Sequence, residues 1–87
     1  MKADKTKVLN LLKTARGQMD GLIKMVEEDR YCVDISHQLM ATSAVLKSCN
    51  REVLDAHLNS CVKEALVSGN SEEKVKEIMQ IVEKLTK

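Results

Sequence analysis

The sequence predicts an all-α protein built from three helices, of which the second is much longer than the other two. Its 87 residues contain no proline, three glycines and one aromatic side chain, although 44% of them are hydrophobic. Aliphatic residues without helix breakers favour packed helices over sheets. The hydrophobic positions also recur at intervals of three and four residues, which is the period of an amphipathic helix.

The first predicted helix begins at Lys5 and ends near Glu28. Its hydrophobic face carries Val8, Leu12, Ala15, Met19, Leu22, Ile23 and Val26. Gly17 and Gly21 lie four residues apart inside this helix, and each glycine costs about 1 kcal/mol relative to alanine. We interpret the pair as a place where another helix approaches closely.

The second predicted helix begins at Cys32, after the charged segment 27–31, and runs for about 30 residues, or about 45 Å at the α-helical rise. A helix of this length needs packing partners along its whole extent. The segment 67–70 (Val-Ser-Gly-Asn) predicts its end, and Asn70 with Glu73 can form a capping box for a third helix. The third helix carries a hydrophobic face of Val75, Ile78, Met79, Val82 and Leu85.

The length predicts one domain over residues 1–87, close to the size below which a chain cannot bury a self-sufficient core. Three sparsely spaced cysteines do not fit a disulfide framework, and no apolar run is long enough for a signal peptide or a membrane span. We therefore expect a homo-oligomer in the reducing cytoplasm, without a membrane partner.

His57 and Cys61 form the nucleus of a candidate metal site. They lie four residues apart, which on a helix places both side chains on one face, about 6 Å apart at Cβ. By itself this pair is a weak signal, because a buried histidine and a buried free cysteine on a helix are the more common explanation. Cys32 adds a second thiol, and soft thiolates select metals such as Cu(I) or Zn(II).

Helix geometry separates Cys32 from the other two candidate ligands. On a continuous helix Cys32 lies roughly 37 Å from His57, so one chain cannot close the site. Antiparallel pairing of two long helices in a twofold dimer would create two identical sites. Three protein ligands favour Cu(I), whereas zinc with an open coordination position remains an alternative. The third thiol, Cys49, is predicted to be a packed core cysteine.

The segments Leu12–Leu22, Glu28–Asp34 and His57–Val62 resemble the copper-sensitive operon repressor family of bacterial regulators, and the resemblance covers nearly the whole chain. It implies three-helix protomers in antiparallel four-helix dimers that pair into tetramers, and release of operator DNA when the metal site is filled. It also implies that Cys32, His57 and Cys61 bind Cu(I). Tyr31 and Glu77 match positions that surround the ligands, and Glu77 could accept a hydrogen bond from the free ring nitrogen of His57.

A basic N-terminal region is the candidate DNA-binding surface. Residues 1–24 carry six basic and two acidic side chains, although the net charge of the chain is only +1. The resemblance implies phosphate contacts from Lys5, Lys7, Lys13, Arg16 and Arg51. The chain departs from the family at Leu11 and near Ser48, where basic residues are usual. Without the resemblance, the same charges also fit an ordinary solvated face.

The expected function is that of a Cu(I)-responsive transcriptional repressor rather than an enzyme. No Ser/His/Asp set, paired carboxylates or Gly-rich phosphate loop is recognisable in the sequence, and no small-molecule substrate is expected. Cys61 and His57 also distinguish the chain from relatives that sense nickel, formaldehyde or persulfide. The alternatives are a cytoplasmic copper-buffering protein that does not bind DNA, a sensor of another metal, and a helical interaction protein without metal.

Overall fold

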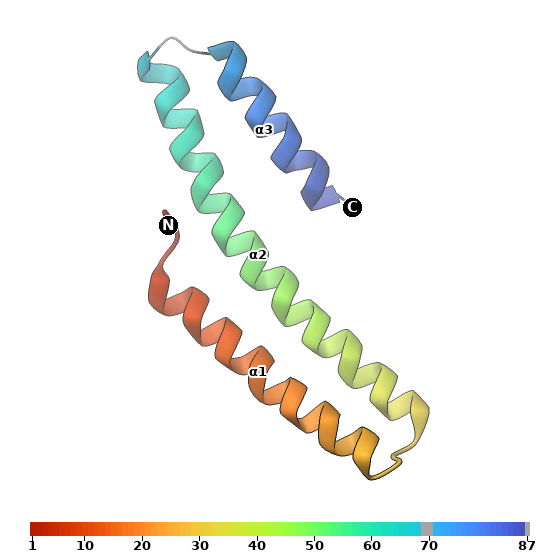
Figure 1. Cartoon of the computed structure of the whole chain (residues 1–87). Coiled ribbons are helices and arrows are strands. Elements are labelled where there is room, and N and C mark those ends of the chain that lie inside the picture. The colour runs from red at the N-terminus through yellow and green to blue at the C-terminus, as the bar shows by residue number, and fades with distance from the viewer. Residues whose placement is uncertain (69–70, 87) are drawn as a thin grey trace. The chain divides into compact units, whose positions relative to one another are not determined.

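The computed structural model describes residues 1–68 and 71–86 and contains three α-helices, with no strand in these ranges (Figure 1). The helices are α1 (Lys5–Glu27), α2 (Cys32–Ser68) and α3 (Ser71–Thr86). The predicted all-α class is confirmed, as is the length of the second helix, which spans 37 residues. The Asn70 cap and the Leu85 side chain lie outside the described residues. Among the described helices, none is both long and apolar enough to cross a bilayer.

The chain divides into two compact units. One contains Lys5–Asn50, which is α1 with the first part of α2, and the other contains Met1–Asp4 with Arg51–Lys87. Single-domain organisation over residues 1–87 stays a prediction.

A tight turn joins α1 to α2. Asp29 adopts a left-handed conformation with φ of 51°, which aspartate tolerates better than most residues. The amides of Asp29 and Arg30 donate hydrogen bonds of 3.1 and 3.0 Å to the carbonyls of Val26 and Met25. This pair of bonds is a Schellman motif, which ends a helix and turns the chain away from its axis. Cys32 therefore lies in the first turn of α2.

The seam between α1 and the first part of α2 is built on a heptad spacing. Val8, Ala15 and Leu22 are the buried residues of α1, and each follows the last by seven positions. Thr42 and Cys49 of α2 are buried with the same spacing. Seven-residue spacing keeps one narrow face toward a neighbouring helix, and small side chains on it let the backbones come close.

Cys49 belongs to this seam, as predicted. Its side chain is buried, and its Sγ donates a long contact of 3.9 Å to the carbonyl oxygen of Val8. The cysteine acts here as a small apolar side chain with a weak donor.

Thr42 and Gln18 form a polar contact inside the otherwise apolar seam. The Thr42 hydroxyl lies 2.9 Å from Gln18 Oε1 and 3.1 Å from the carbonyl oxygen of Gln38. Because Thr42 is only 5% exposed, its hydroxyl depends on these partners instead of water.

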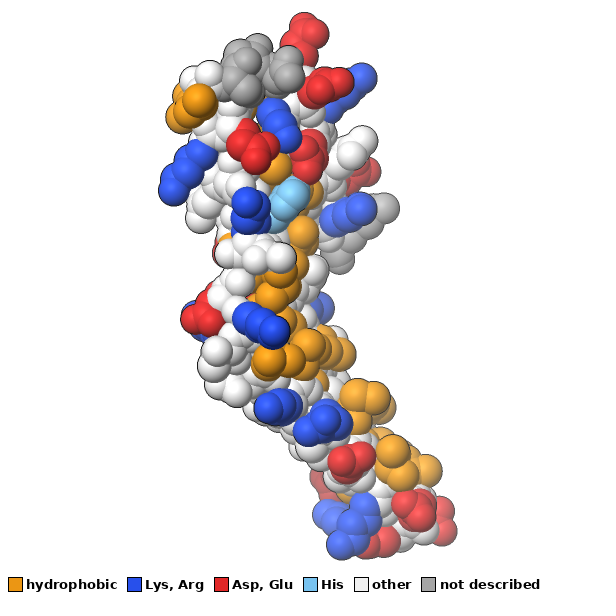
Figure 2. Space-filling model, turned by 60° about the vertical axis from the view of Figure 1, so that its left-hand side comes forward, with side chains coloured by type: hydrophobic (Ala, Val, Ile, Leu, Met, Phe, Trp, Pro, Cys, Tyr) orange, Lys and Arg blue, Asp and Glu red, His pale blue; other side chains and the backbone are white. Residues whose placement is uncertain are grey.

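Many large hydrophobic side chains are exposed on the Lys5–Asn50 unit, and Figure 2 shows such side chains gathered on one face of the molecule. They include Leu9, Leu12, Met19, Ile23, Val26, Val33, Leu39, Met40 and Leu46. Exposed apolar patches of this kind are typical of surfaces that bind other molecules.

The interpretation of Gly17 and Gly21 as a close helix contact is wrong within this chain. A Cβ atom placed on either glycine would meet no described heavy atom within 4 Å. Both glycines are exposed, because the buried face of α1 runs through Val8, Ala15 and Leu22 instead.

We expect Thr42→Val to lower the free energy of unfolding by about 1 kcal/mol, because it leaves the part-buried amide oxygen of Gln18 without its partner. Replacing both partners, as Thr42→Val with Gln18→Leu, should recover much of this loss, since no polar group then stays unpaired. Urea unfolding at fixed protein concentration measures both effects. Strictly additive losses in the double variant would show that the two side chains are not coupled.

Candidate metal centre

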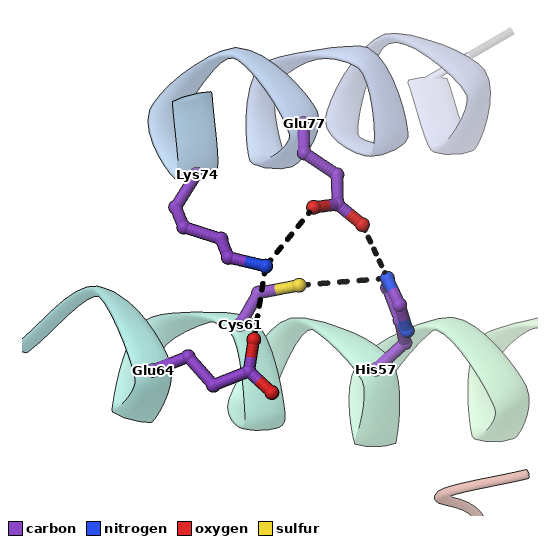
Figure 3. Close-up of polar contacts among 5 residues, drawn as sticks. All are labelled: His57, Cys61, Glu64, Lys74 and Glu77. Atoms are coloured by element: carbon purple, nitrogen blue, oxygen red, sulfur yellow. Dashed lines mark hydrogen bonds and ion pairs between the residues drawn. The ribbon is translucent and has the colours of Figure 1, made fainter. Parts of the chain in front are cut away.

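Three potential metal ligands converge between the second part of α2 and α3 (Figure 3). His57 Nε2 lies 2.7 Å from Glu77 Oε1 and 3.4 Å from Cys61 Sγ. One donor atom from each of the three residues lies within 4.8 Å of the others. The cluster thus offers a nitrogen, a sulfur and an oxygen donor from a single chain.

Local structure explains why these side chains meet. His57 and Cys61 follow each other by four residues in α2, which places them on one helical face. The same face is covered by α3, whose Ile81 is buried together with Cys61. Glu77 stands four residues before Ile81 and therefore projects from the covered side of α3. The predicted contact between Glu77 and His57 is present in the structure.

The Glu77 contact determines the hydrogen-bonding state of the imidazole. A carboxylate only accepts hydrogen bonds, so His57 Nε2 carries a proton when it donates to Glu77. In the neutral ring the lone pair is then on Nδ1. His57 can bind a metal through Nε2 only if Glu77 gives up this hydrogen bond.

Lys74 contacts the other oxygen of the Glu77 carboxylate and is itself paired with Glu64. Lys74 Nζ lies 2.9 Å from Glu64 Oε2 on α2 and 3.7 Å from Glu77 Oε2 on α3. The hydrogen bond from Lys74 lowers the pKa of Glu64 and raises that of Lys74. Glu77 therefore turns one oxygen toward the lysine and the other toward the imidazole.

The pKa values of Glu77 and Cys61 move in opposite directions. The hydrogen bond from His57 is the largest cause that lowers the pKa of Glu77, with burial opposing it and Lys74 adding to it. Burial raises the pKa of the Cys61 thiol, and the negative charge of Glu77 raises it further. Without a metal Cys61 is therefore a neutral thiol at pH 7, and binding as a thiolate releases a proton.

The remaining sequence-predicted residues are not members of this cluster. Cys32 is exposed and Tyr31 is 66% exposed, and both belong to the Lys5–Asn50 unit. Their part in the metal site stays a prediction. The basic side chains Lys5, Lys7, Lys13 and Arg16 are exposed on α1, and Arg51 is exposed on α2 in the other unit.

The sequence analysis did not identify Lys74, which contacts Glu77, or Glu64, which pairs with Lys74. Glu64 follows Cys61 by three positions and Lys74 precedes Glu77 by three, so each shares a helical face with a member of the cluster. That spacing was a usable signal. The pairing itself depends on how α3 lies on α2, which spacing does not specify.

A three-helix chain with a mixed nitrogen, sulfur and oxygen cluster between its second and third helices is a helical protein with a candidate metal site. Sequence comparison assigns the protein to a family. The family described as metal-sensitive transcriptional repressor matches residues 4–84, and the chain belongs to it. The resemblance found in the sequence is thereby confirmed.

The sequence relatives are copper sensors. The chain is 39% identical over 84 residues to the copper-sensing transcriptional repressor CsoR of Bacillus subtilis, covering 97% of this chain and 83% of the relative. It is 42% identical over 78 residues to CsoR of Mycobacterium ulcerans, covering 90% of this chain and 67% of the relative.

The structural relatives respond to two different metals. The nickel-responsive transcriptional regulator InrS matches with a TM-score of 0.87 and 28% identity, covering 98% of this chain and 96% of InrS. The copper-sensing repressor CsoR with Cu(I) from Geobacillus thermodenitrificans matches with a TM-score of 0.81 and 33% identity, covering 100% of this chain and 94% of that one. Because one fold serves both regulators, the donor atoms and not the fold decide the metal.

Proposed function

We propose that this protein is a Cu(I)-responsive transcriptional repressor, which binds operator DNA without metal and releases it when Cu(I) is bound. The observation that carries the proposal is the His57–Cys61 pair with Glu77 on the imidazole. It occurs in a chain 39% and 42% identical to copper-sensing repressors. The protein acts in the cytoplasm, where DNA is accessible and thiols stay reduced.

The proposed Cu(I) ligands are His57, Cys61 and Cys32 of a second protomer. Two thiolates and one imidazole suit Cu(I), a soft ion that accepts low coordination numbers. Assignment of Cys32–Ser68 to one helix supports a ligand from another protomer, since an α-helix rises about 1.5 Å per residue. Tyr31 directly precedes Cys32 in the sequence, so it would lie beside the same metal site.

The exposed apolar surface supports the proposed homo-oligomer. Among the described residues, those of α1 that one chain buries are Val8, Ala15 and Leu22, whereas Leu12, Met19 and other large side chains stay exposed. A second copy in a four-helix arrangement would cover such surface, and Gly17 and Gly21 would leave room for its backbone. We propose an antiparallel dimer that pairs into a tetramer.

Glu77 is the proposed link between the metal site and DNA binding. If His57 binds Cu(I) through Nδ1, Nε2–H stays free to donate to Glu77, and the hydrogen bond ties the occupied site to α3. Lys74 contacts the same carboxylate and pairs with Glu64, so it links Glu77 to α2. A coupling free energy of about 3 kcal/mol between the two sites corresponds to a change of roughly 150-fold in DNA affinity.

The proposed DNA-binding surface consists of Lys5, Lys7, Lys13 and Arg16 on α1 with Arg51 on α2. These side chains are exposed, and an oligomer would repeat them. Binding through several phosphate contacts releases counterions and so weakens as salt rises.

We expect Cys32→Ala and Cys61→Ala each to abolish tight Cu(I) binding, because two remaining ligands do not form the soft coordination set. Cys49→Ala should leave Cu(I) affinity nearly unchanged, since the Cys49 thiol packs against α1. Competition titration against a Cu(I) chelator measures all three. Comparable losses in all three variants would contradict the ligand assignment.

Mixing the two ligand variants tests whether the site lies between protomers. A mixed antiparallel dimer of Cys32→Ala and Cys61→Ala chains keeps one complete site, because one chain supplies Cys32 and the other supplies His57 and Cys61. Random exchange of equal amounts should therefore restore about one quarter of the wild-type number of tight Cu(I) sites per chain. No recovery after denaturation and joint refolding would place all ligands within one chain.

We expect the metal-free protein to bind operator DNA, and Cu(I) to weaken this binding by roughly 100-fold. Glu77→Ala should retain Cu(I) but reduce its effect on DNA binding to a few-fold, because the bound imidazole loses its link to α3. Fluorescence anisotropy at several salt concentrations, with and without Cu(I), measures both effects.

The charge variants complete this experiment. Lys13→Gln should weaken DNA binding and reduce its salt dependence, whereas Lys76→Gln on α3 is the control expected to change neither. Cu(I) binding without DNA binding would favour a copper-buffering protein.

A further inference from the structure

We propose that His57, Cys61 and Glu77 of a single protomer form a Zn(II) site, with Glu77 as a metal ligand and without Cys32. This inference deepens the proposed function, because it gives the same metal centre a second donor set for a different class of ion. Glu77 is a ligand in one set and a hydrogen-bond acceptor in the other.

Distances among the donors fit a tetrahedral ion. Zinc–ligand bonds of about 2.0 to 2.3 Å separate neighbouring donor atoms by roughly 3.3 to 3.6 Å. His57 Nε2 and Cys61 Sγ are 3.4 Å apart, within this range. His57 Nε2 and Glu77 Oε1 are 2.7 Å apart, which is hydrogen-bond distance. To bind zinc, the carboxylate oxygen would move away from Nε2 by about 0.6 Å. The third pair of donors, the Cys61 sulfur and a Glu77 oxygen, lies within 4.8 Å before any such adjustment.

One ring nitrogen faces both other donors. Nε2 of His57 contacts the Cys61 sulfur as well as the Glu77 oxygen, so the three converging atoms are Nε2, Sγ and Oε1. A metal bound through Nε2 takes the place of the imidazole proton, and Glu77 then has no hydrogen bond to accept from the ring. Its carboxylate is left facing the ion and becomes the third ligand.

The chemistry of the donors separates the two ions. Zn(II) accepts imidazole, thiolate and carboxylate together, and three protein ligands leave a position for water. Cu(I) selects soft donors and gains little from a carboxylate, so it requires a second thiolate. Within one protomer the described site offers a single thiol, Cys61, beside the imidazole.

Charge favours the same assignment. A thiolate and a carboxylate neutralise a doubly charged ion, and the neighbouring Lys74–Glu64 ion pair adds no net charge. Lys74 lies beside Glu77 Oε2 at 3.7 Å, so the other oxygen, Oε1, remains directed at the site. Lys74 and Glu64 are therefore positioning residues for the zinc-binding carboxylate.

Separate Zn(II) and Cu(I) competition titrations of the wild-type protein and three variants test this proposal. We expect Cys32→Ala to keep its Zn(II) affinity within about 3-fold while it loses tight Cu(I) binding. Glu77→Gln should lose Zn(II) affinity by roughly 100-fold and Cu(I) affinity by less than about 10-fold, because the amide oxygen can still accept from the imidazole. Glu73→Gln, the same change at an exposed carboxylate one turn earlier on α3, should alter neither affinity.

Co(II) serves as a spectroscopic probe of the zinc ligands. The Cys32→Ala protein should keep the thiolate-to-cobalt charge-transfer band, and Cys61→Ala should lose it.

Circular dichroism and sedimentation identify any variant that fails to fold. If Glu77→Gln fails to fold, Glu77→Asp takes its place, and its shorter carboxylate should weaken Zn(II) binding more than Cu(I) binding. Equal loss of Zn(II) and Cu(I) in Cys32→Ala would overturn the proposal, as would unchanged Zn(II) affinity in Glu77→Gln. Neither result would contradict copper sensing, which fails only if the wild-type protein lacks tight Cu(I) binding or a DNA response to it.

Discussion

The hydrogen bond between His57 Nε2 and Glu77 Oε1 is the contact on which the candidate site depends. It joins α3 to the part of α2 that carries the ligands, and it selects the ring nitrogen that keeps a proton. Lys74 reinforces it through its contact with the other carboxylate oxygen, and Glu64 on α2 holds Lys74 in place through an ion pair. The His57–Glu77 contact is compatible with a metal bound through Nδ1 but is lost when a metal binds through Nε2, because a metal and a proton cannot occupy the same lone pair. The site and the position of α3 are therefore physically linked.

The same contact bears on metal selectivity. A nickel-responsive regulator and a copper-sensing repressor share this fold, so the helices provide a common frame and the side chains on it choose the ion. In this chain the carboxylate of Glu77 stands between two roles. In the proposed copper sensor it accepts a hydrogen bond from an imidazole that would bind the soft ion through Nδ1, whereas in the proposed zinc site it would be a ligand of a harder ion.

The small size of the chain limits how much hydrophobic surface one protomer can bury. The described residues bury a narrow seam of Val8, Ala15, Leu22 and Cys49, with Thr42 as a hydrogen-bonded polar member. Large side chains such as Met19, Ile23 and Leu39 remain exposed. A chain of 87 residues has too little interior to cover them all, which is the physical reason for proposing that a second copy covers them.

The sequence by itself determined the helices and part of the site. Hydrophobic periodicity located α1, α2 and α3, because the spacing of apolar residues reflects which face of a helix is buried. The four-residue interval between His57 and Cys61 placed both side chains on one helical face. The sequence also identified Cys49 as a core residue from its distance along the helix to the other thiols. Glu77 entered through the family resemblance, and its contact with His57 was borne out.

Only the tertiary structure decided how α3 meets α2. It revealed Lys74 and Glu64 behind Glu77, and it showed that one nitrogen, Nε2, faces both the thiol and the carboxylate. It also showed that Gly17 and Gly21 meet no neighbour within the chain. Helical periodicity fixes which residues share a face, but the rotation and offset of one helix on another arise from packing between residues far apart in the sequence, which no local pattern encodes.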